Sequence, residues 1–472
     1  MSAGLLVSII ISLAIWYSNS WNTGYLPINT NQVFDHFGQP YNISNVLDER
    51  GSFDERKYAS YSAPYIGSMF TVLYGAYFSM YAGFATYAVL HIRREIKLGL
   101  RNLLRCFTFP WRKLRKARGK GGAGKPRPEE QQHTDVHNRL MAAYPEVSEW
   151  WYLGVLVVSL IFGVLGLTLY PTFTSPLVVF YGIALALIVI IPNGIIASST
   201  GIEIPQDILA GILGSIIARG NPLSILYFRS YGFITLAHAT AFAKDLKLAH
   251  YVKIPPRVTF VGQMVSTFIS TLICACVMMY QVGIPDVCTP NAPNRYFCPG
   301  VKVGATDIIL SGTVGSLRIF GVQYPWLLMG FLYGAVVVVG LWGLKRWWPG
   351  SRALRQVHSM VFLVGSIQLI PYNFAYSLPT VPVAWFSWIY IRGRYPGFWS
   401  KYNFVLSSAL SAGIAISALA MAFTVQWADV KLDWWGNTQQ AQGCEKDPCL
   451  LRTLGPGERF FPWWDGSKSP AP

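Results

Sequence analysis

The sequence predicts an all-α fold, a polytopic transmembrane helical bundle with re-entrant or broken helices. Hydrophobic residues make up 52% of its 472 positions and charged residues only 13%, a low value for a soluble protein. Apolar stretches long enough to cross a bilayer core of about 30 Å recur along the chain. Prolines interrupt some of these stretches, and a proline inside a helix removes a hydrogen bond and bends or ends it.

Nine apolar stretches are predicted to be membrane helices. They are 4–17, 68–92, 151–170, 176–199, 203–219, 226–243, 258–281, 326–344 and 403–425. A further segment, 358–392, contains Pro371, Pro379 and Pro382. Its halves are too short for two full crossings, so a re-entrant hairpin is expected there.

Positive charge orients the bundle. Residues 93–127 contain 13 Lys or Arg against a single acid, Glu95, and this excess accounts for most of the formal net charge of +16. Short basic loops stay on the cytoplasmic side of a membrane, so 93–148 is predicted to be a cytoplasmic loop. A nucleic-acid partner is the other interpretation of a basic cluster. The position of this cluster between membrane helices favours the lipid bilayer as the partner and no nucleic acid.

Alternation from that loop places 18–66, 282–325 and the polar tail 436–472 outside. Two independent features agree with this assignment. Asn42 begins the sequon Asn-Ile-Ser, which would carry a glycan on an external loop. Four of the seven cysteines also fall on external segments, where disulfides persist. These are Cys288, Cys298, Cys444 and Cys449, for which we expect the pairs 288–298 and 444–449, although four cysteines allow three connectivities.

Acids and bases are unusually frequent between Asn193 and Arg257, in sequence otherwise apolar enough for a membrane. Each ionisable group in hydrocarbon costs about 2.5–3.5 kcal/mol or more unless it faces a partner or a water-filled cavity. The region is therefore predicted to build a polar pathway for substrate and protons. The candidate pathway residues are Asn193, Glu203, Asp207, Arg229, Tyr231 and Asp245.

Several of these residues have a structural alternative. Glu203 and Asp207 share one face if both are helical, or they lie in a wet loop with Asp207 at a helix N-terminus, where the dipole favours an acid. Asn193 follows Pro192, which is expected to break its helix and to expose carbonyls to a cavity. Lys253 and Arg257 are either ordinary cytoplasmic anchors or parts of a gate made rigid by the two prolines between them.

The motif Lys253-Ile254-Pro255-Pro256-Arg257, preceded by Asp245-Leu246-Lys247-Leu248, closes the run from Gly232 to Arg257. With Asp135–Met141 and Trp399–Asn403, this run resembles the peptide-transporting branch of the oligopeptide transporter family over about residues 10–435. The resemblance implies proton-coupled symport of short peptides, glutathione-like ones included, in the plasma membrane. It also favours an internal helix over a signal peptide at 4–17.

The departures from the family pattern are equally informative. The family's N-terminal half, with its asparagine-proline-glycine box, is absent, so the sequence is expected to be a fragment or truncated gene model that begins in a middle helix. Ser387 and Ser411 stand where the family has asparagine and aspartate, and Arg229 replaces a lysine. A transport-dead remnant with a structural or regulatory role is therefore one alternative. A metal-chelate carrier of the sister branch is another, which the intact motif disfavours.

Enzyme motifs are lacking in the sequence. It contains no HExxH, CxxC or GxSxG, and its seven histidines are scattered without the spacing of metal ligands. We therefore expect no enzyme activity, no metal site and no cofactor.

Overall fold

The computed structural model describes residues 1–101, 136–218, 220–289, 292–293, 298–369, 378–428, 430, 433–438 and 449–458. The structure is 75% helical, and the strands among the described residues are β1 (Val33–Phe34) and β2 (Tyr65–Ile66), which pair antiparallel. The all-α prediction is therefore confirmed.

Six helical runs within the described residues are long and apolar enough to cross a membrane. They are α7 (Glu149–Leu169), α8 (Leu177–Thr200), α12 (Pro256–Val282), Val303–Gln323, Pro325–Trp347 with α15 (Met329–Trp347), and Pro396–Gln426 with α21 (Pro396–Met421). Five of them coincide with predicted stretches. Together with the family assignment below, they identify an integral membrane protein.

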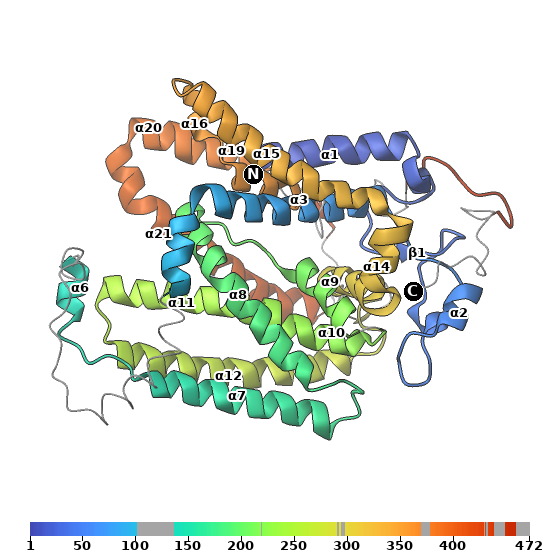
Figure 1. Cartoon of the computed structure of the whole chain (residues 1–472), viewed down its shortest axis with the longest axis horizontal. Helices are drawn as coiled ribbons and strands as arrows, with labels where there is room; N and C mark the ends of the chain where they lie inside the picture. The colour runs from blue at the N-terminus through green and yellow to red at the C-terminus, as the bar shows by residue number, and fades with distance from the viewer. Residues whose placement is uncertain are drawn as a thin grey trace.

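The helix α3 (Ser68–His91) packs against both α1 (Ser2–Tyr17) and α15, in the upper layer of Figure 1. Glycines on α15 allow close contact, because a Cβ added at Gly334 would lie only 1.8 Å from the Ser79 carbonyl oxygen. Four tyrosines make α3 less apolar than the six runs above. Neighbouring helices bury most of it, which compensates for its polar hydroxyl groups.

The chain between α8 and α12 is broken several times. The segment α9 (Asp207–Ile217) has 11 residues, so it extends about 17 Å and is too short to cross the bilayer core. The prediction of a full span over 203–219 is therefore wrong. After α9, the segments α10 (Pro222–Arg229), π-helical η3 (Ser230–Ile234) and α11 (Thr235–Val252) follow one another as a helical run.

Residues 299–323, which fall within the predicted external loop 282–325, form an interrupted helix instead. Its segments are α13 (Pro299–Asp307), π-helical η5 (Ile308–Gly315), α14 (Ser316–Arg318) and π-helical η6 (Ile319–Gln323). The loop prediction is wrong for this part because the run buries polar residues that made it look hydrophilic. Those buried residues are Thr306, Asp307, Ser311, Thr313 and Ser316.

The predicted hairpin 358–392 is made of short pieces. They are α17 (Ser359–Ser366), α19 (Thr380–Trp385) and π-helical η8 (Phe386–Ile391), followed by α20 (Arg392–Arg394). Pro371 lies outside the described residues, so the re-entrant turn stays a prediction. The remaining described elements are α6 (Val136–Met141), η7 (Pro325–Leu328), α16 (Arg352–Gln356), η9 (Ala422–Gln426) and α22 (Trp435–Thr438).

Residues 18–66, here called the cap, contain η1 (Ser20–Tyr25), β1, η2 (Ile43–Val46), α2 (Glu55–Ser60) and β2. Arg318 of α14 fastens the cap, with Nη2 2.7 Å from Glu55 Oε1 and the guanidinium over the rings of Phe53 and Tyr58. Burial raises the pKa of Tyr58 to about 12, so its ring packs as a neutral group. The cap is therefore held to α14 of the 299–323 run.

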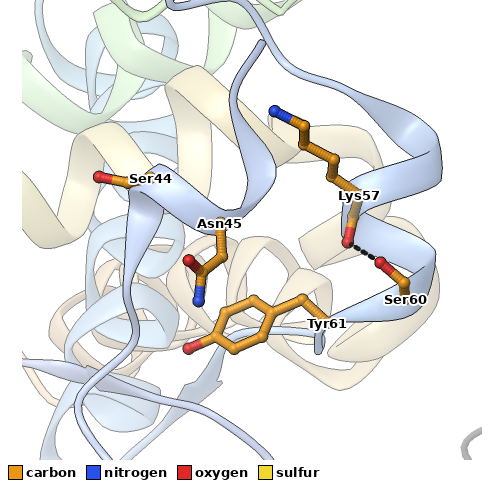
Figure 2. A pocket seen from close by; sticks show the side chains of 5 residues that line it. All are labelled: Ser44, Asn45, Lys57, Ser60 and Tyr61. Atoms are coloured by element: carbon orange, nitrogen blue, oxygen red, sulfur yellow. Dashed lines mark hydrogen bonds between the residues drawn. The ribbon is translucent and has the colours of Figure 1, made fainter.

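A shallow hollow on the cap lies between η2 and α2 (Figure 2). Its lining residues are Ser44, Asn45, Lys57, Ser60 and Tyr61. Asn42, the predicted glycosylation site, caps η2 beside this hollow and is exposed. The position is accessible, and glycosylation itself stays a prediction.

The predicted disulfide between Cys288 and Cys298 is confirmed. Cys449 is also disulfide-bonded. Cys444 lies outside the described residues, so the predicted 444–449 pair is not tested. The segment around Cys449 is attached to the cap, since the N–H groups of Leu451 and Arg452 both donate to the Gly24 carbonyl.

Candidate functional site

The most buried ion pair of the described residues joins Arg229 to Asp307. Arg229 Nη1 lies 2.6 Å from Asp307 Oδ2, and the two side chains are only 17% and 9% exposed. Arg229 ends α10 immediately before η3, and Asp307 ends α13 immediately before η5. π-Helical turns are rare in proteins, and those that occur often lie at functional sites. Buried charges are also costly, so the pair marks a candidate site.

Three donors from different elements hold the Asp307 carboxylate. Oδ2 accepts from Arg229, while Oδ1 accepts from Tyr74 Oη at 3.1 Å and from Ser311 Oγ at 3.3 Å. Tyr74 belongs to α3 and is fully buried, and Ser311 belongs to η5 itself. Hydrogen bonds to an ionised acceptor are strong, so these three donors offset part of the cost of burying the carboxylate.

A second acid, Asp207, faces this pair from the N-terminus of α9. It lies within electrostatic range of both Asp307 and Arg229. Its Oδ1 atom is nevertheless buried and accepts no hydrogen bond from a described residue. A buried acceptor without a partner costs about 1–3 kcal/mol. Such an atom is therefore a candidate contact for a proton or a ligand.

Gly211 brings α9 close to the ion pair. It stands four residues after Asp207, hence on the same helical face. A Cβ added at Gly211 would lie 3.4 Å from both Asp307 Oδ2 and Ser311 Oγ. The helix α9 therefore contacts Asp307 with a glycine and presents Asp207 one turn earlier.

Three tyrosines of α3 cover the acids from the other side. Tyr74, Tyr77 and Tyr81 are three and four residues apart, so they share one face of the helix. Tyr74 donates to Asp307, Tyr77 lies beside Asp207, and Tyr81 Oη accepts the Leu209 N–H at 3.1 Å. We call the set Asp207, Arg229, Asp307, Tyr74, Tyr77, Tyr81 and Ser311 the charged cluster.

The cluster occupies the part of the molecule where broken helices meet. Figure 1 shows α8, α9 and α10 between the layer of α1, α3 and α15 and the layer of α7 and α12. Each charged member stands at a helix end or at the start of a π-helical segment. Helix breaks deep in a membrane protein supply partial charges and polar groups that bind substrates and ions.

Sequence reasoning identified two of the three charged members, Asp207 and Arg229. It missed Asp307, because the stretch around it was assigned to an external loop. It also missed the tyrosines of α3, although their spacing of three and four residues is a readable signal of one polar helix face.

Asn193 lies elsewhere than expected. The helix α8 continues through Pro192 to Thr200, so the prediction that this proline breaks the helix is wrong. Asn193 is 3% exposed, and its Oδ1 accepts the Ile204 N–H at 3.2 Å. The residue therefore positions the non-helical segment that leads into Asp207.

The structure does not bring Glu203 and Asp245 into the cluster. Glu203 precedes α9 and forms an ion pair with Lys244 at the surface. Of the two alternatives given above for Glu203, the structure therefore has the solvated loop. Asp245 is exposed and accepts from Gln263 Nε2 at 3.1 Å, which links α11 to α12.

Tyr231 also lies apart from the charged cluster, in a slot between α7 and α8. Glycines form this slot, since a Cβ at Gly163 would lie 2.3 Å from the Tyr231 hydroxyl oxygen, and one at Gly182 would lie 2.8 Å from Tyr231 Cβ. The tyrosine therefore packs helices together at the place where the sequence predicted a pathway residue.

The motif from Lys253 to Arg257 forms the turn between α11 and α12. Lys253 ends α11 with a left-handed φ of +70°, and Pro256 begins α12. Lys253 Nζ lies 2.6 Å from His137 Nδ1, while Arg257 Nε donates to the Glu146 carbonyl at 3.2 Å. The motif thus contacts the segment that precedes α7 through these two side chains, a pair of contacts that we call the clamp. Its role as a gate stays a prediction.

No group of three potential metal ligands occurs among the residues that the structure describes. What the fold and the cluster define instead is a membrane protein of transporter type, in which apolar helices surround charges placed at helix breaks.

The family model described as OPT oligopeptide transporter protein matches residues 1–425. This chain belongs to the oligopeptide transporter family, whose members are transporters and not enzymes. The family resemblance inferred from the sequence motifs is thereby confirmed.

Proteins similar to this chain from fungi and plants support the same family. Oligopeptide transporter 2 of Saccharomyces cerevisiae is 31% identical over 94% of this chain and 50% of its own length. Glutathione transporter 1 of Schizosaccharomyces pombe is 28% identical over 97% and 51%. Oligopeptide transporter 3 of Arabidopsis thaliana is 29% identical over 95% and 57%. The chain thus spans about half the length of these relatives. No solved structure gives a significant match.

Proposed function

We propose that this protein carries short peptides, glutathione-like peptides included, across the plasma membrane together with protons. The charged cluster is the polar centre of this activity. The observation that carries the proposal is the buried pair of Arg229 and Asp307, with Asp207 beside it, at the meeting point of broken helices. A membrane protein retains such charges where a polar substrate or an ion passes.

The cluster has the chemistry that a peptide requires. A peptide carries a carboxylate at one end and an ammonium group at the other. Arg229 offers guanidinium N–H groups to the carboxylate, and Asp207 offers a buried Oδ1 without a described donor to the ammonium group. The names of the relatives, oligopeptide transporter and glutathione transporter, support the same substrate class.

Proton coupling is supported by two carboxyl groups in one low-dielectric site. Two adjacent carboxylates and a single guanidinium leave one negative charge without a partner, which favours proton binding. The remnant alternative makes the opposite prediction, namely that the intact chain neither binds nor moves a peptide.

The test is peptide uptake by proteoliposomes that contain the purified full chain. Radiolabelled tetrapeptide and glutathione are supplied with an inward proton gradient, and a protonophore is added in a parallel sample. We expect accumulation that the protonophore abolishes, and that Asp207→Asn reduces at least tenfold. Glu55→Gln, in the exposed pair on the cap, serves as the control with unchanged uptake. Absence of both peptide binding and uptake would leave the remnant alternative standing.

A further inference from the structure

We infer that a peptide carboxylate and Asp307 compete for Arg229, and that Asp307 binds a proton when the peptide takes its place. This inference rests on the proposed function and deepens it, because it assigns the carboxylate subsite and the proton carrier to two named residues.

The guanidinium of Arg229 has donor groups available to a second carboxylate. Only Nη1 bonds to Asp307, and the other N–H groups donate to no residue that the structure describes. At 17% exposure, the Arg229 side chain is also the more open member of the pair. A guanidinium binds a carboxylate best through two parallel N–H bonds. An incoming bidentate carboxylate can therefore displace the single bond to Asp307.

The other groups around Asp307 determine its charge once Arg229 has left. Tyr74 from α3 and Ser311 from η5 still donate to Oδ1, and Gly211 of α9 contacts Oδ2 without offering a charge. The remaining charged group within range is the like-charged Asp207 at the start of α9. Oδ2 therefore loses the only positive partner that it has among the described residues.

A buried carboxylate without a counter-charge and near another acid is stable when it binds a proton. The new O–H bond forms on Oδ2, the oxygen that Arg229 leaves, and the proton comes from solvent water. Oδ1 keeps its two donors throughout. When the peptide leaves, Arg229 returns to Asp307 and the proton is released.

This exchange neutralises the site. The carboxylate and the ammonium group of the peptide cancel each other, and the proton offsets the one negative charge that the two acids and Arg229 leave without a partner. The peptide and its proton are thus bound as a unit, which is the physical requirement for symport. Binding of one carboxylate should take up about one proton.

The inference is tested by counting the protons that the purified full chain takes up on binding a tetrapeptide. Calorimetric titrations in buffers with different ionisation enthalpies give this number directly. We expect about one proton for the wild-type chain and for Glu55→Gln. Asp307→Asn should bind the peptide with close to zero proton uptake.

A carboxyl-amidated tetrapeptide provides a test without any mutation. It should bind the wild-type chain about tenfold to a hundredfold more weakly, the loss of a charge-assisted bond, and without proton uptake. Arg229→Lys should keep the proton uptake and reduce the penalty of amidation, since lysine lacks the two-pronged donor geometry.

The outcomes are distinguishable. Peptide binding by the wild-type chain without proton uptake would overturn the exchange. Equal proton uptake on binding the free and the amidated peptide would overturn it too. Proton uptake that survives in Asp307→Asn and disappears in Asp207→Asn would also overturn the exchange, because Asp207 would then carry the proton. Absence of any peptide binding would instead contradict the proposed function.

Discussion

Removing Arg229 should be among the most destabilising single changes in this chain. In Arg229→Met, Asp307 keeps its 9% exposure and its hydrogen bonds from Tyr74 and Ser311 but loses its cation. Breaking a buried pair by removing one partner typically costs about 3–5 kcal/mol, because an uncompensated charge stays buried. Replacing both members, in Arg229→Met with Asp307→Leu, removes the two charges together and should recover much of that loss.

The matched control is the pair of Arg318 and Glu55, which has a similar separation of 2.7 Å but a Glu55 side chain that is 55% exposed. Solvent screens such a pair, so Glu55→Gln should cost about 0–1 kcal/mol. The assay is equilibrium unfolding of each purified variant in detergent, followed by tryptophan fluorescence. If Arg229→Met were no more destabilising than Glu55→Gln, or if the double variant were worse than Arg229→Met alone, the buried-charge argument would be refuted.

Three other residues give independent tests of the cap, the close contact of α9 and the clamp. Asn42→Gln should abolish a glycosidase-sensitive mass shift of the wild-type protein on gels, and the absence of such a shift in the wild type would count against an external cap. Gly211→Leu should push against Asp307 and destabilise the protein by about 1–3 kcal/mol in the same unfolding assay, whereas an unchanged stability would contradict the close contact. Arg257→Ala should loosen the segment that holds Glu146, seen as faster proteolysis around that residue with peptide affinity retained, and a loss of affinity at unchanged proteolysis would contradict the clamp.

Hydropathy alone located the helices that other segments of this chain leave largely uncovered. In α12 only 6% of the most apolar window is buried by the protein, and in the run Pro396–Gln426 none of it is. A membrane helix with few protein neighbours has no partners for polar side chains in the bilayer core, so it is uniformly apolar and easily recognised. The family motif from Lys253 to Arg257 is equally local, and the sequence was sufficient to place it.

Helices inside the protein were harder to recognise, for a physical reason. In Val303–Gln323, 56% of the best window is buried against other segments. Neighbouring residues can satisfy polar groups there, so Thr306, Asp307 and Ser311 are tolerated in a helix that then resembles a loop. The short helix α9 led to the opposite error. Its apolar residues suggested a helix that crosses the whole membrane, whereas they are apolar because they pack against other parts of the protein.

The candidate site divides in the same way. The sequence alone determined that Asp207 and Arg229 are charges in an apolar setting, since the cost of burying an ion is a property of the residue and its local surroundings. Only the tertiary structure decided which groups compensate them. Asp307 lies 78 positions beyond Arg229, and Tyr74 is 233 positions away from Asp307. Local periodicity carries no information about contacts at such separations, which arise when distant helices pack, and it is this packing that sets one guanidinium against two acids.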